Sequence, residues 1–253
     1  MRKNSAKALI KAGKPALGVM LNFPSPAVIE VCGYAGLDFV VIDAEHGPMD
    51  PETTESMVRA AEVSGITPLA RIGQNVQQYI LRYLDAGVMG VQMPWVNTRA
   101  DAEAVIRSVK YVPVGKRGLA GVRVAQYGLT TPLPQYMQEA NQETMIITQV
   151  ETVEAVQNLP QVLELEPIDV FFIGPTDLSV SMGYPGRPTE PVVQAAIDSV
   201  IRQSLAAGKA VGTIARDGEH AKQLIDKGVT YLAGTVVTLL GNSLKQFRAA
   251  VPK

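Results

Sequence analysis

The sequence predicts a (β/α)8 TIM barrel, and three observations support that prediction. Apolar runs of strand length alternate eight times with amphipathic segments of helix length. A chain of 253 residues with 47% hydrophobic content can bury the core of one such barrel. The chain also lacks a GxGxxG turn after the first strand and lacks a P-loop, which weakens the alternative of a doubly wound open sheet. We therefore expect one domain over residues 1–253.

The expected elements follow one another with clear turn signals. The eight expected strands are residues 16–21, 39–43, 67–71, 90–94, 145–151, 170–174, 210–215 and 231–235. Helices end at a glycine, which takes the left-handed conformation without steric cost, in YAGLDF, VSGITP, DAGVMG, AAGKAV and DKGVTY. Asp50-Pro51 and Pro191 mark helix starts, since proline suits the first helical turn. The Gly- and Pro-rich interruption at 111–142 is expected to be a lid or binding loop.

Charge and composition exclude several classes of protein. The net charge of -1 and the pI near 6.2 give no electrostatic reason to expect nucleic acid or an anionic membrane as a partner. Cys32 is the only cysteine, so an intrachain disulfide and a thiolate metal cluster are excluded, and we expect it to be a small core residue. No run approaches 18 consecutive apolar residues, which predicts a cytoplasmic protein without a membrane span.

The most informative stretch is FVVIDAEHGP, at residues 39–48. Its β-branched and aromatic start reads as a strand buried on both faces. The strand ends in Asp43, Glu45 and His46, and barrel enzymes place their chemistry at strand ends. The alternative is that Asp43 caps the next helix and His46 lies at the surface. We expect His46 to move a proton, because imidazole can do so near neutral pH, and Asp43 to orient it.

Other strand ends add an arginine and two carboxylates. The third expected strand ends in Arg71, the fifth in Gln149 and Glu151, and the sixth leads through Gly174 to Asp177. None of the eight ends carries a lysine, which disfavours Schiff-base chemistry.

Glu151 and Asp177 together predict a site for a hard divalent ion such as Mg²⁺ or Mn²⁺, although each could instead cap a helix. A 2-oxo acid could offer such an ion two oxygens, and Arg71 could stabilise an enolate. The second histidine, His220, is expected at the surface of a helix.

Five motifs together resemble the HpcH/HpaI family of class II, metal-dependent pyruvate aldolases. Its members include 4-hydroxy-2-oxoheptane-1,7-dioate aldolase and 2-dehydro-3-deoxyglucarate aldolase. The resemblance covers nearly the whole chain, and the motifs are IDAEHGP, AR at 70–71, GKRG at 115–118, QVET at 149–152 and FIGPTDLSVSMG at 172–183. It implies a barrel of the phosphoenolpyruvate/pyruvate-binding type. It also implies cleavage or formation of a 4-hydroxy-2-oxo acid, with pyruvate and an aldehyde as the small-molecule partners and a metal-stabilised pyruvate enolate between them.

The resemblance also implies roles for individual residues. Glu151 and Asp177 would ligate Mg²⁺, Mn²⁺ or Co²⁺, with Gln149 shaping the metal site. Arg71 would hold the pyruvyl oxygens, and His46 would act as the base toward the C4 hydroxyl.

By the same resemblance, the backbone after Gly174, at Pro175 and Thr176, would cradle the substrate carboxylate. Asp85 matches an aspartate that family members supply from a neighbouring subunit. This implies a homo-oligomer, commonly a hexamer built as a dimer of trimers.

Some assignments stay open at this point. The same enolate site could serve a decarboxylase acting on oxaloacetate, or the barrel could be a catalytically silent binding protein. Trp95 could line the mouth, support a subunit contact or pack under a loop, and Arg123 could reach a distal acid group of the substrate. The resemblance also implies that aldehyde specificity would be set where relatives differ, in the segments MLNFPSPAVIE and GTIARDGEH after the first and seventh strands.

Overall fold

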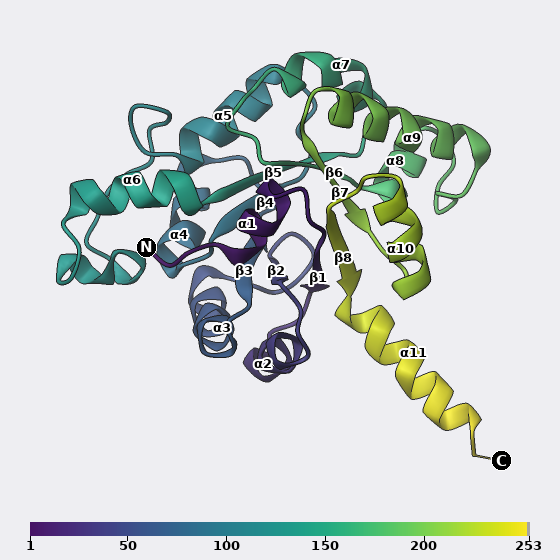
Figure 1. Cartoon of the computed structure of the whole chain (residues 1–253), viewed down its shortest axis with the longest axis horizontal. Coiled ribbons are helices and arrows are strands. Elements are labelled where there is room, and N and C mark those ends of the chain that lie inside the picture. The colour runs from purple at the N-terminus through teal and green to yellow at the C-terminus, as the bar shows by residue number, and fades with distance from the viewer. Residues whose placement is uncertain (252–253) are drawn as a thin grey trace.

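The computed structural model describes residues 1–251 and shows a closed barrel of eight parallel strands (Figure 1). The strands pair in chain order, and β8 closes the ring on β1. They are β1 (Ala16–Leu21), β2 (Phe39–Asp43), β3 (Thr67–Arg71), β4 (Gly90–Met93), β5 (Met145–Val150), β6 (Val170–Ile173), β7 (Ala210–Ile214) and β8 (Tyr231–Thr235). The predicted fold class is confirmed, and four expected strands end one residue earlier than predicted.

Helices alternate with the strands, and most of them cover the outside of the barrel. They are α1 (Ser5–Lys11), α2 (Pro26–Tyr34), α3 (Pro51–Ser64), α4 (Gln77–Ala86), α5 (Arg99–Val109), α6 (Leu133–Glu143), α7 (Val153–Leu163), α8 (Pro175–Ser181), α9 (Pro191–Ala206), α10 (Gly218–Asp226) and α11 (Val236–Ala249), with a 3-10 helix, η1, at Arg123–Gly128. Asp50 caps α3 by accepting a hydrogen bond from the Thr53 amide. The glycines predicted to end helices all have positive φ: Gly36, Gly65, Gly87, Gly208 and Gly228.

Apolar side chains fill two layers, one inside the barrel and one between the sheet and the helices. Along β2, Phe39 and Val41 point into the barrel, whereas Val40 and Ile42 face the helices. The Phe39 ring stacks on that of Tyr231 with 4.2 Å between centroids. Full burial of each such side chain contributes about 1.5–3 kcal/mol. This packing closes the barrel interior, so that chemistry is confined to the strand ends.

The sequence predicted a lid or a binding loop at residues 111–142. In the structure this segment does not cover the mouth of its own barrel. It contains η1 and most of α6, and its Tyr111 and Tyr136 rings pack edge to face in a small core of their own. The Lys116 carbonyl accepts from Gln77 on α4, and Arg123 donates to the carbonyl of Ala86 at the end of that helix. The segment therefore packs along the outside of α4 and reaches the N-terminal ends of the strands.

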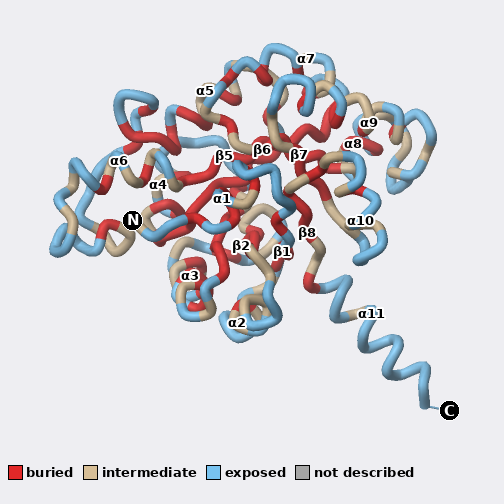
Figure 2. The backbone as a smooth tube through the Cα atoms, viewed as in Figure 1, coloured by how far each residue is buried: buried red, intermediate tan, exposed pale blue. Residues whose placement is uncertain are grey.

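The last helix, α11, leaves the barrel instead of packing on it (Figure 1). Figure 2 shows it as an almost wholly exposed rod. Its exposed residues include the large apolar side chains Val237, Leu239, Leu240, Leu244 and Phe247. In the described part of the chain, no helix combines the length and apolar character that a membrane span requires. Cys32, which was expected in the core, is half-buried and packs against the apolar layer between the sheet and the helices.

Candidate active site

The C-terminal ends of β2 and β3 bring an aspartate and an arginine together. Asp43 and Arg71 are register partners on these neighbouring strands. Arg71 donates from Nε to Oδ1 of Asp43 at 2.9 Å and from Nη2 to Oδ2 at 2.7 Å. This bidentate pair is nearly buried, with 11% of the Arg71 side chain and 4% of the Asp43 side chain exposed. The guanidinium is therefore held as a fixed fork at the mouth of the barrel.

Glu45 is the carboxylate that the sequence prediction left without a role. Its Oε2 lies 3.2 Å from Arg71 Nε and 4.0 Å from His46 Nε2, yet it is buried without a hydrogen-bond partner. Burial raises the pKa of Glu45, the charges of Arg71 and His46 oppose that shift, and Asp43 and Asp177 add to it. Glu45 thus stands between the arginine and the histidine.

The imidazole of His46 is open to solvent, with 62% of its side chain exposed. The Asp43 carboxylate accepts from the His46 backbone amide at 3.3 Å and from the Glu45 amide at 3.2 Å. Asp43 therefore holds the turn that carries His46 and orients Arg71, while the carboxylate near the imidazole is that of Glu45. An exposed imidazole beside a carboxylate can exchange a proton with a substrate hydroxyl.

Glu151, at the end of β5, is held firmly from both sides. Its Oε1 accepts from the Trp95 backbone amide at 2.8 Å, and its Oε2 accepts from the side chain of Gln149. Gly174 leaves room for this carboxylate, because a Cβ there would lie 2.7 Å from Glu151 Oε2. Burial raises the pKa of Glu151, and the charge of Asp177 raises it further. Glu151 follows β5 and Asp177 lies in the first turn of α8, which follows the neighbouring strand β6, so both residues stand at the same end of the barrel.

A chain of hydrogen bonds inside the barrel continues below Glu151. Gln149 Oε1 accepts from Gln92 Nε2 at 2.6 Å, and Gln92 Oε1 accepts from the Tyr231 hydroxyl at 3.2 Å. Gln92 and Gln149 are both almost fully buried. The sequence prediction missed Gln92, although a glutamine within the buried run GVQMP is the signal that could have revealed it, since buried polar groups need partners.

Glu151 and Asp177 suit a hard divalent cation. Both are oxygen donors, they face each other's charge, and Glu45 adds a buried oxygen that lacks a hydrogen-bond partner. Within residues 1–251, no three or more His, Cys, Asp or Glu side chains form a ready metal cage. A cation here would therefore keep positions for water and for substrate oxygens, which is how Mg²⁺ commonly binds.

The predicted substrate-binding turn lies at the start of α8, beside the two carboxylates. Gly174 is the N-cap and Pro175 is the first helical residue. Proline has no amide hydrogen, so the N–H groups that could face an anion are those of Thr176 and Asp177. Thr176 is exposed and Asp177 is half-buried, which leaves this turn accessible from the mouth.

Asp85 lies far from these residues in its own chain. It lies in the last turn of α4, at the opposite end of the barrel from the mouth, and its Oδ1 accepts from Arg117 Nη2 at 3.0 Å. Burial raises the pKa of Asp85, and the Arg117 charge opposes that shift. A role for Asp85 at the mouth would require a second copy of the chain.

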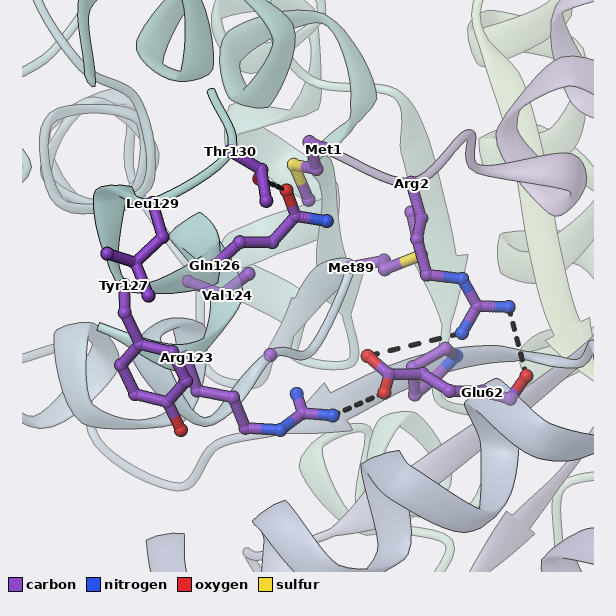
Figure 3. Close-up of a pocket in the computed structure, with 12 residues that line it drawn as sticks. Met1, Arg2, Glu62, Met89, Arg123, Val124, Gln126, Tyr127, Leu129 and Thr130 are labelled. Carbon is purple, nitrogen blue, oxygen red and sulfur yellow. Dashed lines mark hydrogen bonds and ion pairs between the residues drawn. The ribbon is translucent and has the colours of Figure 1, made fainter. Parts of the chain in front are cut away.

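The structure excludes the role suggested for Arg123 and one of the three readings left open for Trp95. Arg123 does not reach toward a substrate; it pairs with Glu62 in a cavity at the N-terminal ends of the strands, as Figure 3 shows. Trp95 does not pack under a loop, since 59% of it is exposed. Its φ of 55° is unusual for a residue other than glycine, and this conformation accompanies the amide contact to Glu151.

Comparison with known proteins gives consistent results along the whole chain. The profile of the HpcH/HpaI aldolase/citrate lyase family matches residues 17–241. The chain is 37% identical over 248 residues to the 4-hydroxy-2-oxo-heptane-1,7-dioate aldolase of Shigella sonnei, covering 98% of this chain and 94% of that protein. The crystal structure of an HpcH/HpaI aldolase/citrate lyase family protein from Burkholderia cenocepacia superposes with a TM-score of 0.92, at 30% identity and covering 98% and 99% of the two chains. Citrate synthase SbnG gives 0.89 at 29% identity, covering 98% and 97%.

The fold and the site define a TIM-barrel enzyme of the carbon–carbon lyase class, with an acidic, oxygen-rich centre beside a fixed arginine. The chain belongs to the HpcH/HpaI aldolase/citrate lyase family.

Proposed function

We propose that this chain is a divalent-metal-dependent aldolase that cleaves, or forms, 4-hydroxy-2-oxo acids, with pyruvate and an aldehyde as the other partners. The observation that carries the proposal is the meeting of Glu151 and Asp177 with the Asp43-anchored fork of Arg71 at the mouth of one barrel. The named relatives, which match nearly the whole chain, favour aldol cleavage over the alternative of oxaloacetate decarboxylation.

Different residues of the chain bind the substrate, stabilise the enolate and transfer the proton. Arg71, fixed by Asp43, holds the 2-oxo acid and stabilises the negative charge of the enolate as it forms. His46 takes the proton of the C4 hydroxyl, and the electron pair of that O–H bond forms the carbonyl of the aldehyde. The C3–C4 bond breaks, the aldehyde leaves, and the electron pair of the broken bond forms the pyruvate enolate. Protonation at C3 completes pyruvate. The amides of Thr176 and Asp177 orient the substrate carboxylate.

Glu151 and Asp177 would hold Mg²⁺, Mn²⁺ or Co²⁺, with Gln149 fixing the Glu151 carboxylate. Such an ion, when bound, supplies Lewis-acid polarisation of the 2-oxo group. Exhaustive dialysis against EDTA should abolish pyruvate release from 4-hydroxy-2-oxo acids, and adding back each ion should rank the three. Full activity after chelation would contradict the metal dependence, and absence of pyruvate release with every ion and substrate tested would contradict the aldolase.

We further propose that the active enzyme is a homo-oligomer in which Asp85 completes the site of a neighbouring copy, with the family's hexamer as the expected state. Two features support this. Asp85 lies at the end of the barrel remote from its own His46. In addition, α11 is exposed along nearly its whole length (Figure 2), and its large apolar side chains lack cover within the described chain. Exposed apolar patches of this kind commonly mark contacts between proteins.

Mixing two inactive variants tests the shared site. His46→Ala and Asp85→Asn subunits, each inactive alone, should regain part of the wild-type rate after mixed refolding, because some mixed sites combine an intact His46 with an intact Asp85. The molar mass from light scattering should match an oligomer. A monomeric, fully active protein would contradict the proposal.

A further inference from the structure

A cavity of about 640 Å³ lies at the N-terminal end of the barrel, opposite the mouth. One of its walls is α1, whose Ala6 and Ile10 pack into the barrel interior. The other walls come from the segment after α5, the end of α6, the segment that leads into β6 and the turn between α9 and β7. None of the lining residues belongs to the candidate active site.

Lysines dominate the charge of this cavity. The charged side chains that line it are Lys7, Lys11, Lys110, Lys209, Glu166 and Asp169. Asp169 is already engaged, because it pairs with Lys7 at 3.0 Å and accepts from the Ile146 amide at 2.9 Å. Within residues 1–251, no carboxylate lies within 4.0 Å of the amine of any of the other three lysines. The cavity therefore carries an excess of positive charge.

Two of the lysines converge on a single carbonyl oxygen. Lys7 Nζ donates to the Thr144 carbonyl at 3.1 Å, and Lys110 Nζ donates to the same carbonyl at 2.6 Å. Lys7 and Lys110 are only 6% and 4% exposed, so water screens their repulsion poorly.

The amine of Lys110 responds to these surroundings. Burial is the main cause that lowers the pKa of Lys110 to about 7, and the charge of Lys7 adds to it. The charge of Lys11 acts in the same direction, whereas Asp169 and Glu166 oppose the shift. An anion in the cavity would favour the charged form of Lys110.

Lys209 adds a further amine from the turn between α9 and β7. Its Nζ donates to the backbone carbonyls of Leu165 at 2.9 Å and Glu166 at 3.3 Å. Burial lowers the pKa of Lys209, and the charges of Glu166 and Asp169 oppose that shift. Neutral carbonyls solvate a buried cation without neutralising it, so Lys209 too would gain from a bound anion.

We propose that this cavity binds a small dianionic oxyanion of the sulfate or phosphate class, with Lys11, Lys110 and Lys209 as its cations. Such an anion would offset the repulsion between the amines and would tie α1 to the turn between α9 and β7. It would thereby stabilise the N-terminal end of the barrel. The inference goes beyond the proposed function and does not depend on it, because no residue of the aldolase site lines the cavity.

Sodium sulfate, titrated at constant ionic strength, is the first probe, because its charge does not change near neutral pH. Calorimetry should show saturable binding of a single sulfate per chain, and Tm should rise by about 5–10 °C at a hundredfold excess over Kd. Inorganic phosphate and glycerol 3-phosphate follow, and the lower Kd of the two tells a free anion from the phosphate group of a metabolite. Sulfate also stabilises proteins generally by exclusion from their surface. A Tm that rises with sulfate without saturable binding would overturn the proposal.

Variants of the lysines locate the site. Lys110→Met and Lys209→Gln should each weaken sulfate binding about tenfold or more, because each loses a charge-assisted hydrogen bond to the anion. Lys11→Gln changes an exposed residue, which protects the test against misfolding, and should weaken binding about twofold to fivefold. Lys222→Gln is the matched control, since Lys222 is an exposed lysine of α10 outside the cavity, and it should bind as wild type does. Wild-type affinity in the folded cavity variants would contradict the site.

Proton uptake tests the contact with Lys110 directly. At pH 8 the Lys110 amine, with its pKa of about 7, is mostly neutral, so the charge that sulfate favours must come from solvent. Wild type should therefore take up most of one proton for each sulfate bound, measured by calorimetry in two buffers of different ionisation enthalpy. Lys110→Met should take up almost none. Equal uptake by the two proteins, or no uptake by wild type, would refute the role of Lys110.

Discussion

Replacing Asp43 by asparagine should disturb both stability and activity, because Asp43 holds the fork of Arg71. Its Oδ1 accepts from Arg71 Nε and from two backbone amides, so the new amide group would occupy the Oδ2 position. There it would face Arg71 Nη2, which lies 2.7 Å from Oδ2 in the wild type, with one donor against another. Breaking a buried ion pair from one side typically costs about 3–5 kcal/mol.

For a chain of this size such a loss corresponds to a fall in Tm of about 6–20 °C, at about 2–4 °C per kcal/mol. A misplaced guanidinium should also lower kcat/KM about 100-fold, since displacements near 1 Å can have that effect. Thermal unfolding followed by circular dichroism and coupled pyruvate release measure the two effects. Glu164→Gln removes a partner from the exposed pair with Arg99, where Glu164 is 70% exposed, and should change stability by less than about 1 kcal/mol. An Asp43→Asn protein as stable and active as that control would refute the reasoning.

Two further predictions use other contacts. Gly174→Ala would place a methyl group 2.7 Å from Glu151 Oε2, so kcat/KM and metal affinity measured by calorimetry should each fall about tenfold or more. Wild-type values of both in this variant would contradict the contact. Burial lowers the pKa of Lys110 to about 7 in the folded protein. Between pH 7 and 9 the unfolded chain therefore binds more protons than the folded protein, and the free energy of unfolding should rise over this range by about 2 kcal/mol. Lys110→Met should lose this rise in urea titrations, and a rise of equal size in that variant would contradict the assignment.

The sequence could predict the barrel closely because its signals are local. Strand runs alternate with glycine-ended helices, and these determine strand positions to within one residue. The bidentate contact of Arg71 with Asp43 follows from the register of two adjacent strands. Which carboxylate lies beside the His46 imidazole could not be predicted, because it depends on the turn after β2. There Glu45 takes the place expected of Asp43. Arg123 was misjudged because its partner, Glu62, is distant in sequence.

The amide chain inside the barrel gives the site a defined direction. Burial raises the pKa of Tyr231, so its hydroxyl keeps the proton and donates to Gln92 Oε1. Gln92 must then present its NH₂ to Gln149, and Gln149 must present its own NH₂ to Glu151. The buried hydroxyl of Tyr231 thereby fixes the orientation of both side-chain amides, so that the NH₂ group of each points toward the mouth of the barrel. Glu151 therefore accepts a hydrogen bond from an NH₂ group. Through this polarity, a substitution at Tyr231 could reverse the amides and reach the mouth without touching any group there.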